Sequence, residues 1–181
     1  DHTTAVFNNK LWVIGGGDKN DVWSSSDGVT WTQATASAPW SGRGSHTTAV
    51  FNNKLWVIGG YRYSGGDKND VWSSSDGVNW TQATASAPWP GRDGHTTAVF
   101  NNKLWVIGGA DGSYKHDVWS SSDGVSWTPA TAYAPWSRRK MQTTAVFNNK
   151  LWVIGGYSYG YLNDVWSSSD GVSWTQATAS A

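Results

Sequence analysis

The side chains best suited to metal chemistry are three histidines that recur at equivalent positions. His2, His46 and His95 each precede a Thr-Thr pair, and the fourth such position holds Gln142. Imidazole is the commonest metal ligand in proteins, so these histidines could hold an ion if they met. Because one copy lacks an imidazole and the others stand in separate repeats, we prefer hydrogen-bonded structural histidines. We therefore predict no metal and no cofactor.

A second recurring set consists of arginines. Arg43, Arg92 and Arg139 stand three residues before the His or Gln positions, and Arg138 and Lys140 add charge beside the third. Clustered guanidinium groups can bind an anion or an acidic partner. A structural role for the same arginines is the alternative, and the sequence leaves both open.

Enzyme chemistry is poorly supported. The chain has no Cys and no Glu, which removes cysteine nucleophiles and the commoner carboxylate pairs. Two Asp residues could still act as acid and base in a glycoside hydrolase. However, Asp21 and Asp27 recur in every repeat, which indicates a scaffold role. We predict a protein without catalytic residues, with a hydrolase as the most distant alternative.

The charge balance excludes several partners. Thirteen Lys and Arg residues match thirteen acidic residues, so the formal net charge is zero. A neutral chain lacks the basic footprint of nucleic-acid binding or of anionic membrane surfaces. No apolar run reaches the length of a membrane span. We predict no nucleic-acid or membrane partner, and the sequence does not indicate a compartment.

The feature that must position these residues is an internal repeat. The string TTAVFNNKLWVIGG occurs four times without change, and DVWSSSDGV follows each copy. Self-similarity at 40 to 50 residues is typical of repeat architectures. We therefore predict one domain over residues 1–181, made of four repeats at 1–40, 41–89, 90–136 and 137–181.

Each repeat has the pattern of a four-stranded antiparallel meander. In the first repeat we expect strands at Thr3–Phe7, Lys10–Ile14, Asp21–Ser26 and Val29–Thr32. Asn8-Asn9 and Asp27-Gly28 are typical hairpin turns. The Leu-Trp-Val-Ile run is apolar on both faces, whereas a half-exposed strand would alternate. Sheets buried on both faces pack radially as blades of a β-propeller, so we predict an all-β fold with four blades.

These residues resemble a known family. The order LWVIGG, loop, NDVW, turn, Trp, then APW-x-x-R-x-x-H is similar to the kelch repeat over essentially the whole chain. The resemblance implies a kelch-type β-propeller. Two departures are the Trp and serine run of the third strand and the SSDGVxW turn, which resembles a shortened Asp-box. In sialidase-type propellers that box is structural, so we assign this turn no catalytic role.

Variation between the repeats is confined to one end of each meander. The loop between the second and third strands changes length, and the segment that joins one repeat to the next changes composition. Loops on a rigid scaffold commonly carry function, and Tyr-rich loops are typical of binding surfaces. The candidate ligand-binding residues on this face are Arg43, Tyr61, Arg62, Tyr63, Arg92, Tyr114, Lys115, His116, Arg139, Tyr157, Tyr159 and Tyr161.

The preferred function is a non-catalytic interaction scaffold that binds a protein through this variable-loop face. A lectin-like carbohydrate binder is the alternative, because tyrosine rings can stack on sugars. Four identical runs also suit a designed or symmetrised propeller without a natural ligand, whose loops vary neutrally.

Four blades leave the closure of the ring undecided. An open arc would expose one apolar blade face at each end. These two faces are complementary and not identical, so two chains could pair head to tail and complete a ring of eight blades. We expect this homodimer; a closed four-blade monomer and a piece of a longer array are the alternatives.

Overall fold

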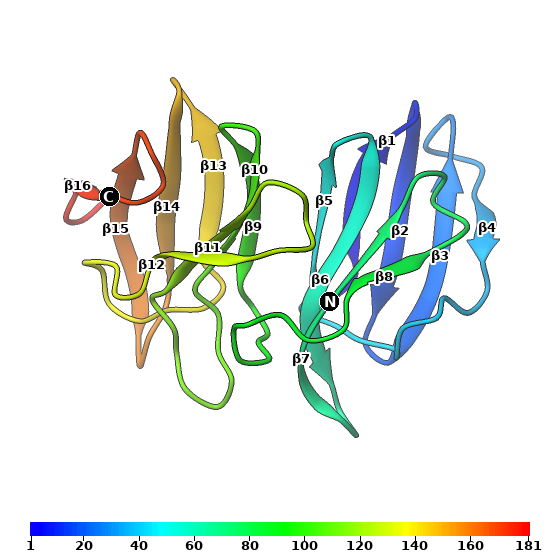
Figure 1. Ribbon diagram of the computed structural model, residues 1–181, viewed down its shortest axis with the longest axis horizontal. Coiled ribbons are helices and arrows are strands. Elements are labelled where there is room, and N and C mark those ends of the chain that lie inside the picture. The colour runs from blue at the N-terminus through cyan, green and yellow to red at the C-terminus, as the bar shows by residue number, and fades with distance from the viewer. The chain divides into compact units, whose positions relative to one another are not determined.

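The structure, a computed structural model that describes residues 1–181, consists of four four-stranded sheets and no helix (Figure 1). Each sheet is antiparallel with its strands in chain order, which confirms the predicted four-bladed, all-β propeller fold. The chain forms two compact units, Asp1–Asp93 and Gly94–Ala181, with two sheets each. The assignment of one domain to residues 1–181 stays a prediction. We call the sheets blades 1 to 4 in chain order.

Unit 1 holds blades 1 and 2. Blade 1 comprises β1 (Thr3–Phe7), β2 (Lys10–Gly16), β3 (Lys19–Ser25) and β4 (Thr32–Thr35). Blade 2 comprises β5 (Thr47–Phe51), β6 (Lys54–Arg62), β7 (Gly66–Ser74) and β8 (Thr81–Thr84).

Unit 2 repeats this arrangement in blades 3 and 4. Blade 3 comprises β9 (Thr96–Phe100), β10 (Lys103–Ile107), β11 (Val118–Ser121) and β12 (Thr128–Thr131). Blade 4 comprises β13 (Thr143–Phe147), β14 (Lys150–Tyr157), β15 (Tyr161–Ser168) and β16 (Thr175–Thr178).

The Asn-Asn turns behave as the sequence predicts. Phe7 pairs with Lys10, so two residues connect β1 to β2. Asn8 and Asn9 have φ angles of 49° and 56°, the left-handed region that a type I′ turn requires and that Asn tolerates. The same angles recur in all four blades.

The Asp-Gly turn is longer than predicted. In blade 1 the fourth strand begins at Thr32, so the expected strand at Val29–Thr32 is wrong. The cause is Asp27, whose carboxylate accepts the backbone N–H groups of Val29 and Thr30 at 2.8 and 2.7 Å. These donors bind the side chain and not a neighbouring strand, so residues 26–31 form a turn.

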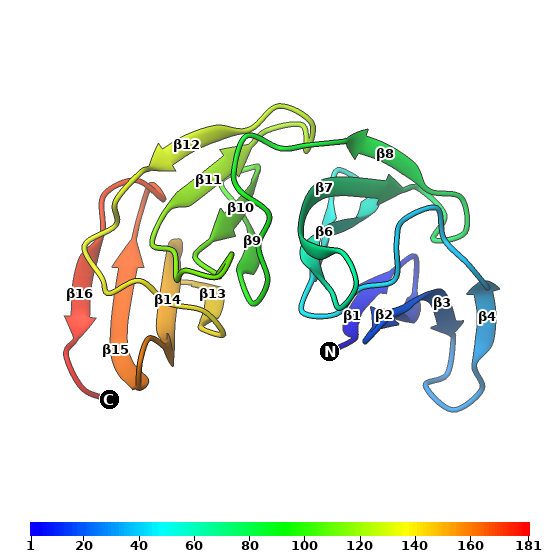
Figure 2. The ribbon, with the colours of Figure 1, turned by 90° about the horizontal axis from the view of Figure 1, so that it is seen from below.

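The core of each unit lies between its two blades, which pack face to face (Figure 2). In unit 1 the side chains of Trp12 and Ile14 pack with Leu55 and Val57 of the next blade. The indole N–H of Trp12 donates to the backbone oxygen of Phe7 at 2.9 Å, so its polar atom is satisfied inside the core. The predicted burial between blades is thus confirmed for this tryptophan.

Burial on both sheet faces is complete in some blades and not in others. In β6 the whole run from Leu55 to Ile58 is at most 2% exposed. In β2, however, Leu11 is 42% exposed, and in β14 Ile154 is 39% exposed. For these two strands the prediction of burial on both faces is wrong, because Leu11 and Ile154 each lie on a sheet face that is open to solvent.

Candidate functional site

The variable loops extend the blades at one end. In blade 2 the hairpin between β6 and β7 continues the ladder through the pairs Tyr61–Asp67 and Arg62–Gly66. In blade 4 the hairpin between β14 and β15 does the same through Tyr157–Tyr161. The loop tyrosines therefore project from ordered strand ends, which suits a binding surface because little entropy is lost on binding.

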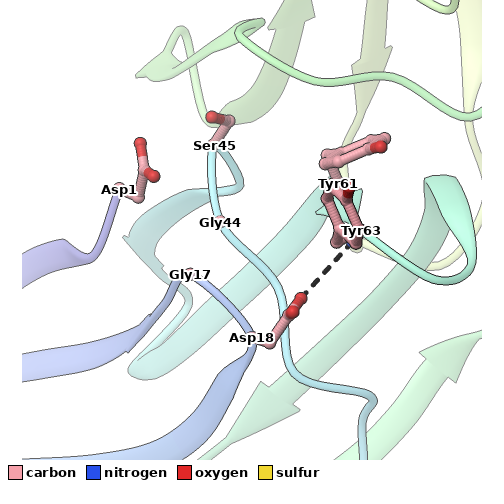
Figure 3. Close-up of a pocket in the computed structure, with 7 residues that line it drawn as sticks. All are labelled: Asp1, Gly17, Asp18, Gly44, Ser45, Tyr61 and Tyr63. Atoms are coloured by element: carbon pink, nitrogen blue, oxygen red, sulfur yellow. Dashed lines mark hydrogen bonds between the residues drawn. The ribbon is translucent and has the colours of Figure 1, made fainter.

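In unit 1 these loops enclose a pocket of about 260 Å³ between blades 1 and 2 (Figure 3). Tyr61 and Tyr63 stand on one side, with Asp1 across the pocket and Asp18 below them. The backbone N–H of Tyr63 donates to the Asp18 carboxylate at 3.4 Å. Gly17, Gly44 and Ser45 complete the lining. The pocket therefore offers aromatic faces beside two carboxylates that accept hydrogen bonds.

Unit 2 carries the equivalent site with different chemistry. Tyr157 and Tyr159 follow a Gly-Gly pair as Tyr61 and Tyr63 do, and Tyr114 occupies the position of Asp18. The ring of Tyr114 lies 6.0 Å from Tyr157 and 5.3 Å from Tyr159, both edge to face. An aromatic residue thus lies beside the tyrosine pair of unit 2, where the carboxylate of Asp18 lies beside the pair of unit 1. The same structural position is therefore an acidic pocket in unit 1 and an aromatic cluster in unit 2.

The aromatic cluster of unit 2 presents much surface to solvent. Tyr159 and Tyr161 are 92% and 94% exposed, and the Tyr161 ring lies 5.5 Å from that of Tyr157. Next to it, Lys115 pairs with Asp111 at 2.7 Å. Exposed aromatic side chains in ordered loops are a common feature of recognition surfaces.

A smaller hollow of about 180 Å³ brings the remaining candidates of blade 3 together. Lys115 and His116 line it with Tyr133 and Arg138, and the ring of His116 lies 5.5 Å from that of Tyr133. Tyr133 is 77% exposed. This hollow adds cationic donors to the aromatic surface of unit 2.

The recurring arginines lie inside the fold. Arg43, Arg92 and Arg139 are all 0% exposed. The guanidinium of Arg139 donates to both carboxylate oxygens of Asp164, at 2.6 and 2.7 Å, and to the Gly155 carbonyl at 2.8 Å. These hydrogen bonds hold the pKa of Asp164 below its usual range. Burial leaves these arginines no surface to offer a ligand, so we omit them from the proposed binding face.

Arg43 forms the same bidentate pair with Asp70, at 2.5 and 2.8 Å. The arginine belongs to the link that precedes blade 2, and its partner to the third strand of that blade. The pair therefore fixes the link to the following blade, a structural role that the sequence left open.

His46 is a buried structural residue. Its Nε2 lies 2.8 Å from the Thr3 hydroxyl of the neighbouring blade. Burial, and then the nearby Arg43 charge, lower the pKa of His46 to about 4, so the ring is neutral at pH 7. The equivalent Gln142 donates to the Ile107 carbonyl at 2.7 Å. No group of three or more His, Cys, Asp or Glu residues is placed to hold a metal ion.

The recurring Asp residues of the turns are also engaged structurally. Asp170 accepts the backbone N–H groups of Val172 and Ser173, both at 2.8 Å, and these bonds lower its pKa to about 2. The Ser168 hydroxyl donates to the same carboxylate at 2.8 Å. A carboxylate held ionised in this way is poorly suited to act as a general acid near neutral pH.

Several pocket residues were absent from the sequence-based set. Asp1, Asp18, Ser45 and Tyr133 line the two hollows described above, and Met141 lines a third hollow of about 480 Å³ on blade 4. The sequence does indicate Asp18, because its counterpart in the third repeat is Tyr114, which is one of the candidate binding residues. It also indicates Met141, which replaces Gly94 at a position where φ is positive, 57° and 59°.

Known proteins support the fold assignment. The model of the KLHDC2/KLHL20/DRC7 Kelch-repeats domain matches residues 1–181. The solved structure titled "Structure of YjhT" is similar with a TM-score of 0.79 and 20% sequence identity; the match covers 98% of this chain and 65% of that chain. This chain thus spans about two thirds of the length of that structure. No curated protein matches.

Proposed function

Because this chain belongs to the Kelch-repeat domain family, we propose that it is a non-catalytic scaffold whose variable-loop face binds a protein ligand. Kelch-repeat propellers are typically protein-interaction scaffolds. The function itself resides in the loops and not in the fold. The residues that we assign to the binding face are Tyr61, Arg62, Tyr63, Tyr114, Lys115, His116, Tyr157, Tyr159 and Tyr161.

One observation carries this proposal: the loops place Tyr pairs at equivalent strand ends in both units and change the residue beside them. Asp18 lies beside the pair in unit 1 and Tyr114 beside the pair in unit 2. Constant aromatic anchors with variable neighbours are the composition of adaptable binding surfaces.

The absence of catalysis is proposed from the state of the carboxylates. The turn carboxylates accept backbone N–H groups, as Asp170 does, and those of Asp70 and Asp164 pair with buried arginines. Each of these carboxylates is committed to hydrogen bonds that fix a turn or a link. Turnover of a glycoside that disappears on changing one Asp would contradict this assignment.

A carbohydrate ligand is the second candidate, and the pocket of unit 1 favours it. Tyr61 and Tyr63 supply flat apolar surface, and the Asp1 and Asp18 carboxylates supply acceptors for hydroxyl groups. Apolar walls with a few placed polar groups are the common form of a small-ligand site.

A parallel screen of a peptide-display library and a glycan array tests these candidates. We expect peptide binding by the wild type, and its loss when Tyr61, Arg62 and Tyr63 are all changed to Ser. All three are exposed side chains, so the melting temperature should stay nearly constant. Lys54→Ser, at the opposite end of the same blade, is the matched control and should bind normally.

The outcomes separate the alternatives. Glycan binding with the same dependence on these residues would establish the carbohydrate candidate instead. Peptide binding that survives the triple substitution would contradict the assigned face. No binding in either screen would support a symmetrised propeller without a natural ligand.

We also propose that one protein partner is a second copy of this chain, joined head to tail so that two copies together contribute eight blades. This self-association uses mainly the faces of the blades. It is read from the mass of the assembly, which is measured separately from ligand binding at the loop face.

A further inference from the structure

Blade 4 and blade 1 each expose a face whose counterparts are buried within the units. We call the side of a blade that packs on the next blade its forward face. The forward residues Phe7 of blade 1 and Phe100 of blade 3 are both 5% exposed, and Ile14 and Ile107 are 0% exposed. In blade 4 the equivalent residues, Phe147 and Ile154, are 62% and 39% exposed.

The opposite side of a blade, its backward face, shows the same contrast. Leu55 of blade 2 and Leu151 of blade 4 are 0% exposed because they pack on the preceding blade. Their equivalent in blade 1, Leu11, is 42% exposed, and Trp31 in the same blade is 38% exposed. The forward face of blade 4 and the backward face of blade 1 are thus open to solvent.

A tryptophan and a glycine define how two blades fit together. The six-membered ring of Trp12 packs so closely on Gly77 of the next blade that a Cβ there would overlap it, and Trp105 packs on Gly171 in the same way. Gly28, the equivalent glycine of blade 1, has only the Leu11 side chain nearby, at 3.6 Å. The backward face of blade 1 therefore contains a vacant seat for a tryptophan ring.

Polar groups repeat along the same interface. The Thr35 hydroxyl donates to the Val78 carbonyl of the next blade at 2.9 Å, and Thr131 donates to Val172 at the same distance. The corresponding donor in blade 4 is Thr178, which is exposed. The corresponding acceptor in blade 1 belongs to Val29, a residue that is 84% exposed.

The part of the interface next to the Gly-Gly pairs is complementary as well. A Cβ on Gly15 would meet the His46 ring of the next blade at 3.3 Å, and one on Gly108 would meet the Gln142 side chain at 2.7 Å. At Gly155 of blade 4 it would meet only backbone atoms of Leu162. Beside it lies a pocket of about 480 Å³ lined by Lys140, Met141, Gly156, Tyr157, Tyr161 and Leu162. The residue equivalent to His46 and Gln142 is His2, which is exposed.

From these matches we infer that the forward face of blade 4 docks on the backward face of blade 1 in a second copy, with Trp152 seated on Gly28. The side chain of His2 enters the space beside Gly155, and the Thr178 hydroxyl donates to the Val29 carbonyl. The inference deepens the proposed self-association by naming its surface. We choose a second copy as the occupant because the tryptophan ring, the threonine hydroxyl and the His2 side chain each find their counterpart on the opposite exposed face of this same chain.

The contact is heterologous, since a forward face meets a backward face. Pairing of two forward faces would place Trp152 against Phe147 and Ile154, with no glycine seat for the ring. In a two-copy assembly each chain contributes one face to each of two equivalent contacts. Both contacts therefore contain both faces.

Charge substitutions on the two faces test the inference. Light scattering of the wild type at micromolar concentration should give twice the chain mass of 19.6 kDa. Leu11→Glu and Phe147→Glu should each give monomers, because either change buries an unpaired carboxylate and weakens association about a hundredfold or more. Tyr133→Glu, at an exposed aromatic residue outside both faces, is the control and should remain dimeric.

Mixing the two variants tests the polarity. The Leu11→Glu chain retains an unsubstituted blade 4, and the Phe147→Glu chain an unsubstituted blade 1, so the mixture should regain a species of twice the chain mass that is held by this one contact and needs a higher protein concentration than the wild type. If Leu11→Glu alone remained dimeric, the forward faces would pair with each other and the inference would be wrong. A monomeric wild type, or a mass that grows beyond two copies, would also overturn it.

Both substituted residues are already solvent-exposed in the single chain, so we expect unchanged near-ultraviolet circular dichroism. If either variant unfolds, Gly28→Ala provides a smaller change at the tryptophan seat and should also lower the dimer fraction. Binding at the loop face is read separately from the screens, so failure of one proposal leaves the other measurable.

Discussion

Two glycine substitutions measure the contact between blades with an internal control. Gly77 and Gly28 both have a φ of 77°, and each donates its backbone N–H to a serine hydroxyl of the same turn. They differ in their surroundings, because Gly77 lies under the Trp12 ring and Gly28 does not. Comparing alanine at the two positions therefore isolates the packing of Trp12 on the next blade.

The expected magnitudes follow from these two contributions. Alanine at a positive φ costs about 1–2 kcal/mol at either position. At Gly77 the added methyl group also displaces a buried indole, and overpacking of this kind costs about 1–3 kcal/mol more. Gly77→Ala should thus lower the free energy of unfolding by about 2–5 kcal/mol in total.

Urea unfolding followed by tryptophan fluorescence gives both values. The measurements belong in a Phe147→Glu background, which removes the proposed self-association and keeps the seat at Gly28 empty. Equal destabilisation by the two alanines would refute the claim that the blade 2 turn packs on Trp12. A larger effect at Gly28 would contradict it more strongly.

Three further substitutions test the roles of the buried histidine, the buried ion pair and the tryptophan between the blades. Because the pKa of His46 is about 4 in the folded protein, the ring takes up a proton on unfolding between pH 6.5 and pH 4. The free energy of unfolding should therefore decrease by on the order of 3 kcal/mol as the pH is lowered through this range. His46→Gln should flatten this dependence in denaturant titrations. Asp164→Ala should cost about 3–5 kcal/mol of unfolding free energy, because it leaves the buried Arg139 unpaired; a loss below 1 kcal/mol on the same titration would argue against a structural ion pair. In the Phe147→Glu background, which removes the proposed self-association, Trp105→Ala should cost about 3–5 kcal/mol of unfolding free energy and Trp152→Ala clearly less, because only Trp105 is fully buried in the single chain; equal midpoints would contradict the difference between the blade faces.

Much of the fold could be predicted because the pattern of each strand and turn occurs four times in the sequence. The Asn-Asn turn and the run from Leu55 to Ile58 determine a meander with two buried faces by local rules alone. The start of the fourth strand could not be predicted in this way, because it depends on hydrogen bonds from the backbone to the Asp27 side chain. The exposure of Leu11 also depends on which blades have neighbours, and a repeat pattern carries no such information.

The candidate site was only partly predictable for a similar reason. The loop tyrosines differ between repeats and could be identified as candidates from composition and position. Asp18 lines a pocket because the loop of blade 1 is short, and that consequence requires the three-dimensional arrangement. Arg43 and Arg139 share the variable link with exposed residues, so sequence position alone did not separate their buried ion pairs from surface charges.

Hydrogen exchange with mass spectrometry, measured on this protein with and without the first ligand recovered from the peptide and glycan screens, shows which end of the blades binds. We expect slower exchange in the loops at residues 61–66, 110–116 or 157–161 when the ligand is bound, and no change at the Asn-Asn turns. Protection of the turns at residues 52–53 and 101–102, with the loops unaffected, would show that the protein binds through the other end of its blades and would contradict the proposed binding face.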